Sequence, residues 1–230
     1  MEQLSAYKNL PKPTLSIKAL TVANLVPLLG VFLLDWDAAA IVLLYWIENL
    51  IVGFLNILRM ILVKVESTAG QFQKLFMIPF FCIHFGGFCA GHGFFLLTFF
   101  KIGTDTDFFS HETTWAGPLV FIQLLFSVIM RLWESRPPGL EWPTLGLLVS
   151  HGISFIWNYV IGKEYLSLKL GNLMSRPYKR IFLMHVAIIA GGVPIMMVGS
   201  PVPLLCILIF LKTGMDIWLH AKSHRKAKVK

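Results

Sequence analysis

The feature that most constrains this chain is a series of seven long apolar segments separated by short polar or turn-forming stretches. An α-helix needs roughly 20 apolar residues to cross the hydrocarbon core of a bilayer. Each segment approaches that length, and breakers such as Asp35-Trp36-Asp37 and Gly199-Ser200-Pro201 stand between neighbours. The segments are residues 15–34, 38–63, 76–100, 115–133, 143–161, 181–198 and 201–219.

The composition requires a bilayer to take this apolar surface. Of the 230 residues, 56% are hydrophobic and only 14% are charged, with a mean hydropathy of +0.71. Soluble domains are nearer half apolar and a quarter charged. We therefore expect an all-α, polytopic transmembrane helical bundle that forms one integral membrane domain over residues 1–230. Residues 1–13 form a polar N-terminal segment, and residues 221–230 form a basic C-terminal tail.

The positive charges do not select one topology. Seven crossings place the loop with Arg131 and Arg136 on the same side as the N-terminus, Arg59, Lys64 and Lys74. The basic stretch 163–180 and the tail then share the other side, so the two sides nearly balance. Seven helices are favoured; a six-helix alternative, in which the fifth segment does not cross, gathers almost every Lys and Arg on one side. Both models predict a multi-pass protein of the inner (plasma) membrane with a cytoplasmic C-terminus.

Several ionisable residues fall at membrane depth, where a charge at a helix centre costs roughly 2.5–3.5 kcal/mol to insert. Glu48 lies on a polar and small face of the second segment, together with Tyr45, Asn49 and Asn56. Lys212 lies within the last apolar segment. We expect Glu48 and Lys212 to face the bundle interior and to be the catalytic candidates, Glu48 as a base.

The third segment carries two histidines and four glycines. His84 and His92 are eight residues apart, about 12 Å along a helix, so one metal ion does not easily bind both. The pair Gly87 and Gly91 predicts a close helix contact. Histidine at such a position is often a structural hydrogen-bonding group, which is also how we interpret His151 in the fifth segment.

The last apolar segment continues this pattern. Lys212, Asp216 and His220 are each four residues apart and share one helix face. With His185 of the sixth segment and His92 of the third, Asp216 and His220 form a candidate metal site; His84 is the alternative to His92. Such nitrogen and oxygen ligands suit zinc or iron(II). The competing interpretation is an ion pair of Lys212 with Asp216 or Glu48, with the histidines hydrogen-bonded to carbonyl groups.

These motifs resemble a family of uncharacterised prokaryotic multi-pass membrane proteins, a domain of unknown function. The resemblance extends over most of the chain from the second segment onward and implies no activity. The matching pieces are Tyr45-Trp46-Ile47-Glu48-Asn49 with Gly53 and Asn56, His84-Phe85-Gly86 with His92, Arg176-Pro177-Tyr178-Lys179-Arg180-Ile181 with His185, and Lys212-Thr213-Gly214-Met215-Asp216 with His220.

Three functions fit these residues. The first is a membrane-embedded metal-dependent enzyme, such as a hydrolase that acts on a lipid or another small amphiphile. The second is a proton- or ion-coupled transporter or channel, in which Glu48, Lys212 and the histidines carry charge. The third is a b-haem electron carrier, which needs paired axial histidines on facing helices. The lipid bilayer is the expected partner. The net charge of +8 suits cytoplasmic loops facing anionic lipid better than nucleic acid, and the oligomeric state is left open.

Overall fold

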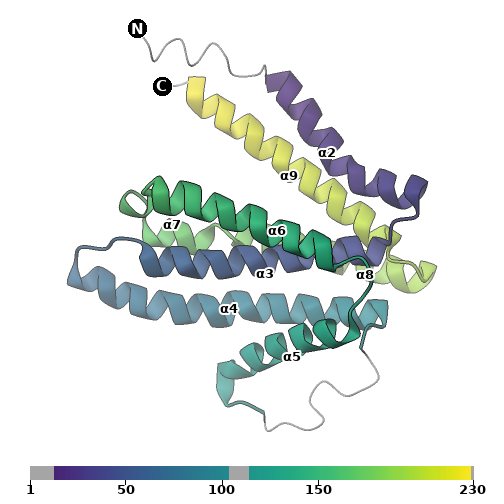
Figure 1. The fold of residues 1–230 in the computed structure, drawn as a ribbon, viewed down its shortest axis with the longest axis horizontal. Helices are drawn as coiled ribbons and strands as arrows, with labels where there is room; N and C mark the ends of the chain where they lie inside the picture. Colours follow the sequence, from purple (N-terminus) through teal and green to yellow (C-terminus); the bar gives the residue numbers. More distant parts are fainter. Residues whose placement is uncertain (1–12, 104–113, 229–230) are drawn as a thin grey trace.

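The structure, a computed structural model, describes residues 13–103 and 114–228, which are predominantly helical (Figure 1). Side chains are described for residues 21, 22, 24–103 and 114–218, so the predicted polar N-terminal segment and basic tail lie outside them. The elements are α2 (Pro13–Leu34), α3 (Ala38–Leu62), α4 (Thr68–Phe100), the 3-10 turn η1 (Gly117–Leu119), α5 (Val120–Ser135), α6 (Glu141–Ser154), the π-helical turn η2 (Phe155–Ile161), the 3-10 turn η3 (Glu164–Leu166), α7 (Leu170–Ser175), α8 (Tyr178–Val198) and α9 (Val202–Lys228).

Each predicted apolar segment lies mainly within one helix of this series, which confirms the prediction of an all-α membrane bundle. Five helical stretches of the described chain are long and apolar enough to cross a membrane. They are Ala38–Leu62, Thr68–Phe100, Gly117–Ser135, Glu141–Ile161 and Leu170–Val198. The remaining two long helices, α2 and α9, lie side by side and lean away from the others (Figure 1).

Local sequence signals set several helix ends. The Asp37 carboxylate accepts a hydrogen bond from the Ala39 amide at 2.9 Å and caps the start of α3. The Ser67 hydroxyl accepts one from the Gly70 amide at 3.1 Å at the start of α4. Gly199 ends α8 with a φ of 66°, a left-handed conformation that glycine adopts without steric cost. These polar and glycine-rich breaks separate the apolar helices.

One pair of consecutive helices, α4 and α5, runs in the same direction. A Cβ atom on Gly86 would lie 3.3 Å from Ile122, and one on Gly93 would lie 2.6 Å from Val128. Further along, Arg131 donates a hydrogen bond to the Gly103 carbonyl at 2.8 Å. The contacts advance together along both helices, so α4 and α5 pack in parallel.

The parallel pair corrects the predicted distribution of charge. Arg131 lies beside the end of α4, whereas Arg59 lies at the opposite end of the bundle, beside Tyr159 at the end of η2. Arg131 and Arg136 therefore do not share a side with Arg59, Lys64 and Lys74. The prediction was wrong because it assumed that every connection joins antiparallel neighbours. We name the two ends of the bundle by their charged residues. The basic end has Arg59, Lys64, Lys74, Lys163, Lys169, Arg176 and Lys179, beside Glu66 and Glu164. The far end has Asp35, Asp37, Glu134 and Glu141, beside Lys101, Arg131 and Arg136.

Close packing of α3 on α4 forms the centre of the bundle. Trp46 is fully buried, and its indole N–H donates to the Cys89 carbonyl at 2.8 Å. A Cβ atom on Gly93 would lie 2.5 Å from the Trp46 ring, so only glycine fits there without a shift. By contrast, a Cβ atom on Gly91 would meet nothing within 4 Å. The predicted close helix contact is therefore confirmed at Gly87, which packs on Phe121 of α5. It is wrong at Gly91, which faces open space.

Candidate functional site: a charged cluster and a histidine pocket

Glu48 is the centre of a charged cluster between α3, α6 and α8. Its side chain is only 15% exposed. One carboxylate oxygen forms an ion pair with the Arg180 guanidinium, and the other lies 3.1 Å from Nε2 of His151. The carboxylate thus joins three helices at once, which offsets part of the cost of placing a charge among apolar helices.

Arg180 has a second anchor on α3. Its Nε donates to Oδ1 of Asn49 at 3.4 Å, and the Asn49 amide nitrogen donates to the Tyr45 carbonyl at 3.1 Å. The Arg180 guanidinium is thus held by two consecutive residues of α3, Glu48 and Asn49. A planar guanidinium with several fixed donors is suited to such simultaneous contacts.

A second group of polar residues lies beside this cluster, on α9 and α2. The Asn24 amide donates to Oδ2 of Asp216 at 3.0 Å. The Lys212 ammonium lies 4.8 Å from the centre of the Tyr45 ring, a cation–π contact. A small cavity of about 50 Å³ separates Lys212 and Asp216 from Arg180 and Asn49. Among the described residues, Glu48 pairs with Arg180 and His151, and not with Lys212 as one interpretation of the sequence expected.

A vestibule connects the far end of the bundle with Glu48. It is a cavity of about 670 Å³ between α2, α3 and α6. Trp36, Asp37 and Pro138 line it at the far end, and Tyr45 and Glu48 line it in the interior. Asp37 and Glu48 are eleven residues apart, about 16 Å along α3. Tyr45 also lines the small cavity, so one residue borders both spaces.

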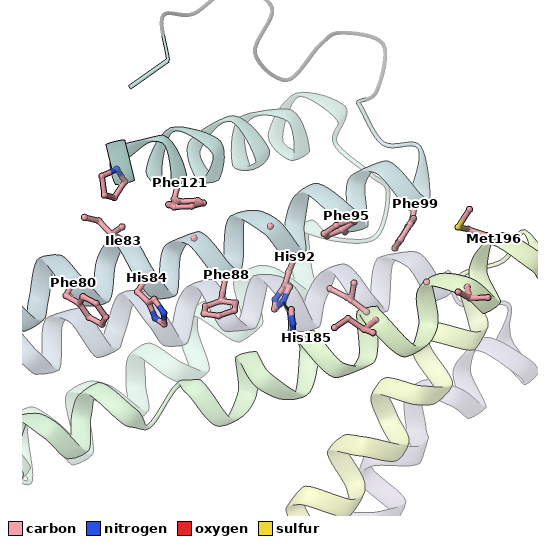
Figure 2. A pocket seen from close by; sticks show the side chains of 17 residues that line it. Phe80, Ile83, His84, Phe88, His92, Phe95, Phe99, Phe121, His185 and Met196 are labelled. Atoms are coloured by element: carbon pink, nitrogen blue, oxygen red, sulfur yellow. Dashed lines mark hydrogen bonds between the residues drawn. The ribbon is translucent and has the colours of Figure 1, made fainter. Parts of the chain in front are cut away.

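A separate histidine pocket of about 790 Å³ lies between α4, α5 and α8 (Figure 2). Its polar side chains are three histidines, His84, His92 and His185. Aromatic rings recur with the histidines at four-residue spacing on one face of α4, which is the spacing that keeps residues on one side of a helix. This face carries Phe80, His84, Phe88 and His92.

The histidines of this pocket are paired across α4 and α8. Nε2 of His92 lies 3.0 Å from Nδ1 of His185, and Nδ1 of His84 lies 2.9 Å from the Tyr178 hydroxyl. His92 is 3% exposed. In a bis-histidine haem site the iron-bound nitrogens are about 4 Å apart, two metal–nitrogen bonds of about 2.0 Å. The contact of His92 with His185 is thus a direct hydrogen bond with no room for iron between them.

The structure brings together only part of the predicted metal site. His92 and His185 meet, and His84 lines the same pocket. Asp216 lies elsewhere, because its face of α9 packs toward Asn24 of α2 and not toward α4. The side chain of His220 lies outside the described residues. Within the described part of the chain, no three His, Cys, Asp or Glu side chains form a group that could hold a metal.

The partners of several candidate residues were not predicted from the sequence. Arg180 is the partner of Glu48, yet it stands at the edge of an apolar segment and was grouped with the loop cations. His151 was interpreted as a structural hydrogen-bonding group, and the structure supplies the partner that was not predicted, the Glu48 carboxylate. The signal for His151 was present: with Ser154 and Asn158 it makes the fifth segment polar on one side. For Arg180, only the adjacent motif Arg176-Pro177-Tyr178-Lys179 marked the region.

Comparison with known proteins gives a family but no activity. Residues 6–230 match the model of a family of unknown function (DUF6498), in agreement with the resemblance noted in the sequence. No curated protein and no solved structure matches the chain.

Proposed function

The chain belongs to DUF6498, a family without an assigned activity, and from its interior charges we propose that it is a proton-coupled transporter of a small anion. The observation that carries this proposal is the position of Glu48. It lies in the interior part of the vestibule and divides its carboxylate between Arg180 and His151. Ionisable residues among membrane helices are costly and mark ion or proton pathways by default.

The shared partner Arg180 gives a mechanism for coupling. When Glu48 is ionised, its carboxylate holds the Arg180 guanidinium. When Glu48 takes up a proton, the guanidinium loses its counter-ion, and a small anion takes that place. Proton and anion thus bind together, and the loaded cluster has the same net charge as the empty one. The anion shifts the protonation equilibrium of Glu48 only because the cluster binds it more tightly when Glu48 is protonated than when Glu48 is ionised.

The small cavity beside the cluster supplies the next step of the route. Lys212 and Arg180 both line it, so an anion released by Arg180 meets a second cation. Lys212 has the Tyr45 ring as its neighbour, and the Asp216 carboxylate is held by Asn24. No described carboxylate lies within ion-pair distance of the Lys212 ammonium, so this cation is available to a passing anion, and Asp216 is an acceptor for the proton.

Proton flux in liposomes tests the proposal. Purified protein is reconstituted with a pH-sensitive dye inside, and inward gradients of chloride, nitrate and phosphate are imposed in turn. We expect at least one anion to drive proton uptake above that of protein-free liposomes. The uptake should be lost in the double variant Glu48→Gln/Arg180→Gln.

The double variant separates function from stability. Glu48→Gln alone leaves Arg180 without its counter-ion, and breaking a buried pair in this way costs roughly 3–5 kcal/mol. Removing both charges avoids that penalty. The matched control is Lys64→Gln/Glu66→Gln, which removes an ion pair whose side chains are 57% and 81% exposed. A folded double variant that transports at the wild-type rate, or a wild type that no anion activates, contradicts the proposal.

A metal-dependent enzyme acting on an amphiphile, using zinc or iron(II), is the second candidate. The grouping of three histidines in one pocket favours it: His92 and His185 meet there, His84 lines the same space, and a metal ion would replace the hydrogen bond between His92 and His185. In this hypothesis His185 and His220 are ligands, and metal content per purified chain falls in His185→Ala and His220→Ala but not in His151→Ala. Purified protein that binds no zinc or iron under loading conditions contradicts this candidate.

A further inference from the structure

The histidine pocket is distinct from the transport route and has an uncharged lining among the described residues. Within that part of the chain no Lys, Arg, Asp or Glu lines it, and the titratable side chains on its wall are the three histidines. Its rim faces outward: Ile189, Val193 and Met196 are 66%, 63% and 77% exposed. In a membrane bundle, such exposed apolar side chains face lipid. The pocket therefore opens sideways to the bilayer, and a ligand with a full charge would find no counter-ion there.

On its α4 side the pocket presents flat aromatic rings and, at Gly91, an unoccupied space that we call the open floor. Phe80, Phe88 and Phe95 lie along one side of the cavity with His84 between the first two (Figure 2). The His84 ring stacks on Phe80 at 5.1 Å with an interplanar angle of 15°. At Gly91 an added Cβ atom would meet nothing within 4 Å. Aromatic walls around an open slot fit a planar group, because rings stack favourably on flat partners.

Hydrogen bonding leaves His185, which lines the pocket, with an N–H donor. Nδ1 of His92 is buried, and no described residue is its hydrogen-bond partner. An N–H there would be an unpaired buried donor, so the proton of His92 belongs on Nε2, which donates to Nδ1 of His185. A neutral His185 that accepts at Nδ1 carries its own proton on Nε2. That N–H makes no hydrogen bond within the described part of the chain and is available to a ligand.

We propose that the histidine pocket binds a long-chain amphiphile with a flat, uncharged headgroup that accepts a hydrogen bond, the chemistry of a prenylated quinone. The apolar chain lies along the lipid-facing rim, and the ring lies against Phe88. A headgroup carbonyl accepts the hydrogen bond from Nε2 of His185. This proposal is independent of anion transport, because Glu48 and Arg180 do not line the pocket.

Binding of decylubiquinone to the purified protein in detergent tests the proposal. The comparison probe is decylbenzene, which keeps a flat six-membered ring and the ten-carbon chain but has neither the carbonyl nor the methoxy groups. We expect saturable binding of the quinone and weaker binding of decylbenzene. His185→Phe should weaken quinone binding about threefold to tenfold, the effect of one neutral hydrogen bond. His185→Gln keeps a donor near the same place and should recover part of the affinity.

A steric variant gives an independent readout. Gly91→Leu places a side chain in the open floor and should abolish quinone binding while leaving thermal stability and anion-driven proton uptake unchanged. Gly152→Leu, on α6 and also with open space around its Cβ position, is the matched control that should bind normally. The proposal is overturned if folded Gly91→Leu binds the quinone like the wild type. It is also overturned if decylbenzene binds as tightly as the quinone and His185→Phe has no effect, because the pocket is then a lipid-filled crevice.

Discussion

Among single residues, the two interior carboxylates differ most in their surroundings. Glu48 has two basic partners, Arg180 and His151, whereas Asp216 has the neutral amide of Asn24. A carboxylate held by a guanidinium loses a strong attraction when it is protonated, but one held by an amide loses much less. Of the two, Glu48 is therefore the residue whose protonation changes how helices are held together.

Trp46 carries a stability prediction at the same scale. It is fully buried, and its indole N–H is bonded to the Cys89 carbonyl. Trp46→Phe removes that donor and leaves space beside Gly93, so we expect a loss of about 1–3 kcal/mol in the free energy of unfolding. Denaturant unfolding in detergent measures it. Trp142→Phe, at a side chain that is 80% exposed, is the control and should stay within about 0.5 kcal/mol. Equal stability of the two variants would contradict the packing described for α3 and α4.

The sequence predicted some of these residues and not others for a physical reason. His92 and His185 were placed together because helix spacing and membrane depth restrict where each imidazole lies, and the structure brings them to 3.0 Å. Arg180 was not predicted as the partner of Glu48, because a long side chain near a helix end reaches either the headgroups or the interior. Only packing against Asn49 shows which direction it takes.

Among the elements, the parallel packing of α4 and α5 is the arrangement that sequence reasoning did not anticipate. Consecutive membrane helices with short connections are antiparallel, and residues 101–116 were interpreted as such a connection. Hydropathy identifies a helix but carries no information about the direction in which it packs on its neighbour. The glycines show the same limit: Gly91 and Gly93 are two residues apart, yet one faces open space and the other faces Trp46.

Disulfide formation tests the parallel arrangement. A Cβ atom on Gly87 would lie 3.4 Å from Cβ of Phe121, close to the ~3.8 Å separation found in disulfides. With Cys82, Cys89 and Cys206 replaced by Ala, we expect Gly87→Cys/Phe121→Cys to form a cross-link under mild oxidation. The control pair Gly87→Cys/Trp133→Cys should stay reduced, since it joins positions that would meet only in an antiparallel hairpin. The opposite result, a cross-link to position 133 alone, would show that α5 runs the other way.

For the whole molecule, the parallel pair resolves the charge balance that the sequence left undecided. With α5 turned, the basic end combines seven basic residues with two acidic ones, whereas the far end combines three basic residues with four acidic ones. Gly191 packs on Leu204, and Lys212 lies over Tyr45, so α9 runs toward the basic end as α3 does. The start of α2 lies beside the end of α9 (Figure 1). The positive-inside rule then predicts that the basic end faces the cytoplasm.

Reporter fusions check this orientation. If the tail is cytoplasmic as we predict, green fluorescent protein fused after Lys230 should fluoresce, and alkaline phosphatase at the same place should be inactive. Alkaline phosphatase inserted between Arg136 and Pro138, at the far end, should be active. Phosphatase activity at Lys230 would place the basic end outside and contradict the orientation.

The proposal of proton-coupled transport depends on one route from the far end through the vestibule to Glu48. Leu44 lines this vestibule between the far end and Glu48. The most direct measurement uses Leu44→Cys in a protein whose native cysteines are replaced. The initial rate of anion-driven proton uptake is measured before and after a membrane-impermeant thiol reagent is added on the side of the far end. We expect the rate to fall to that of protein-free liposomes. The control is Leu148→Cys, at a residue of α6 that is 49% exposed, and its rate should not change. Full modification of Leu44→Cys with an unchanged rate would contradict a route through the vestibule.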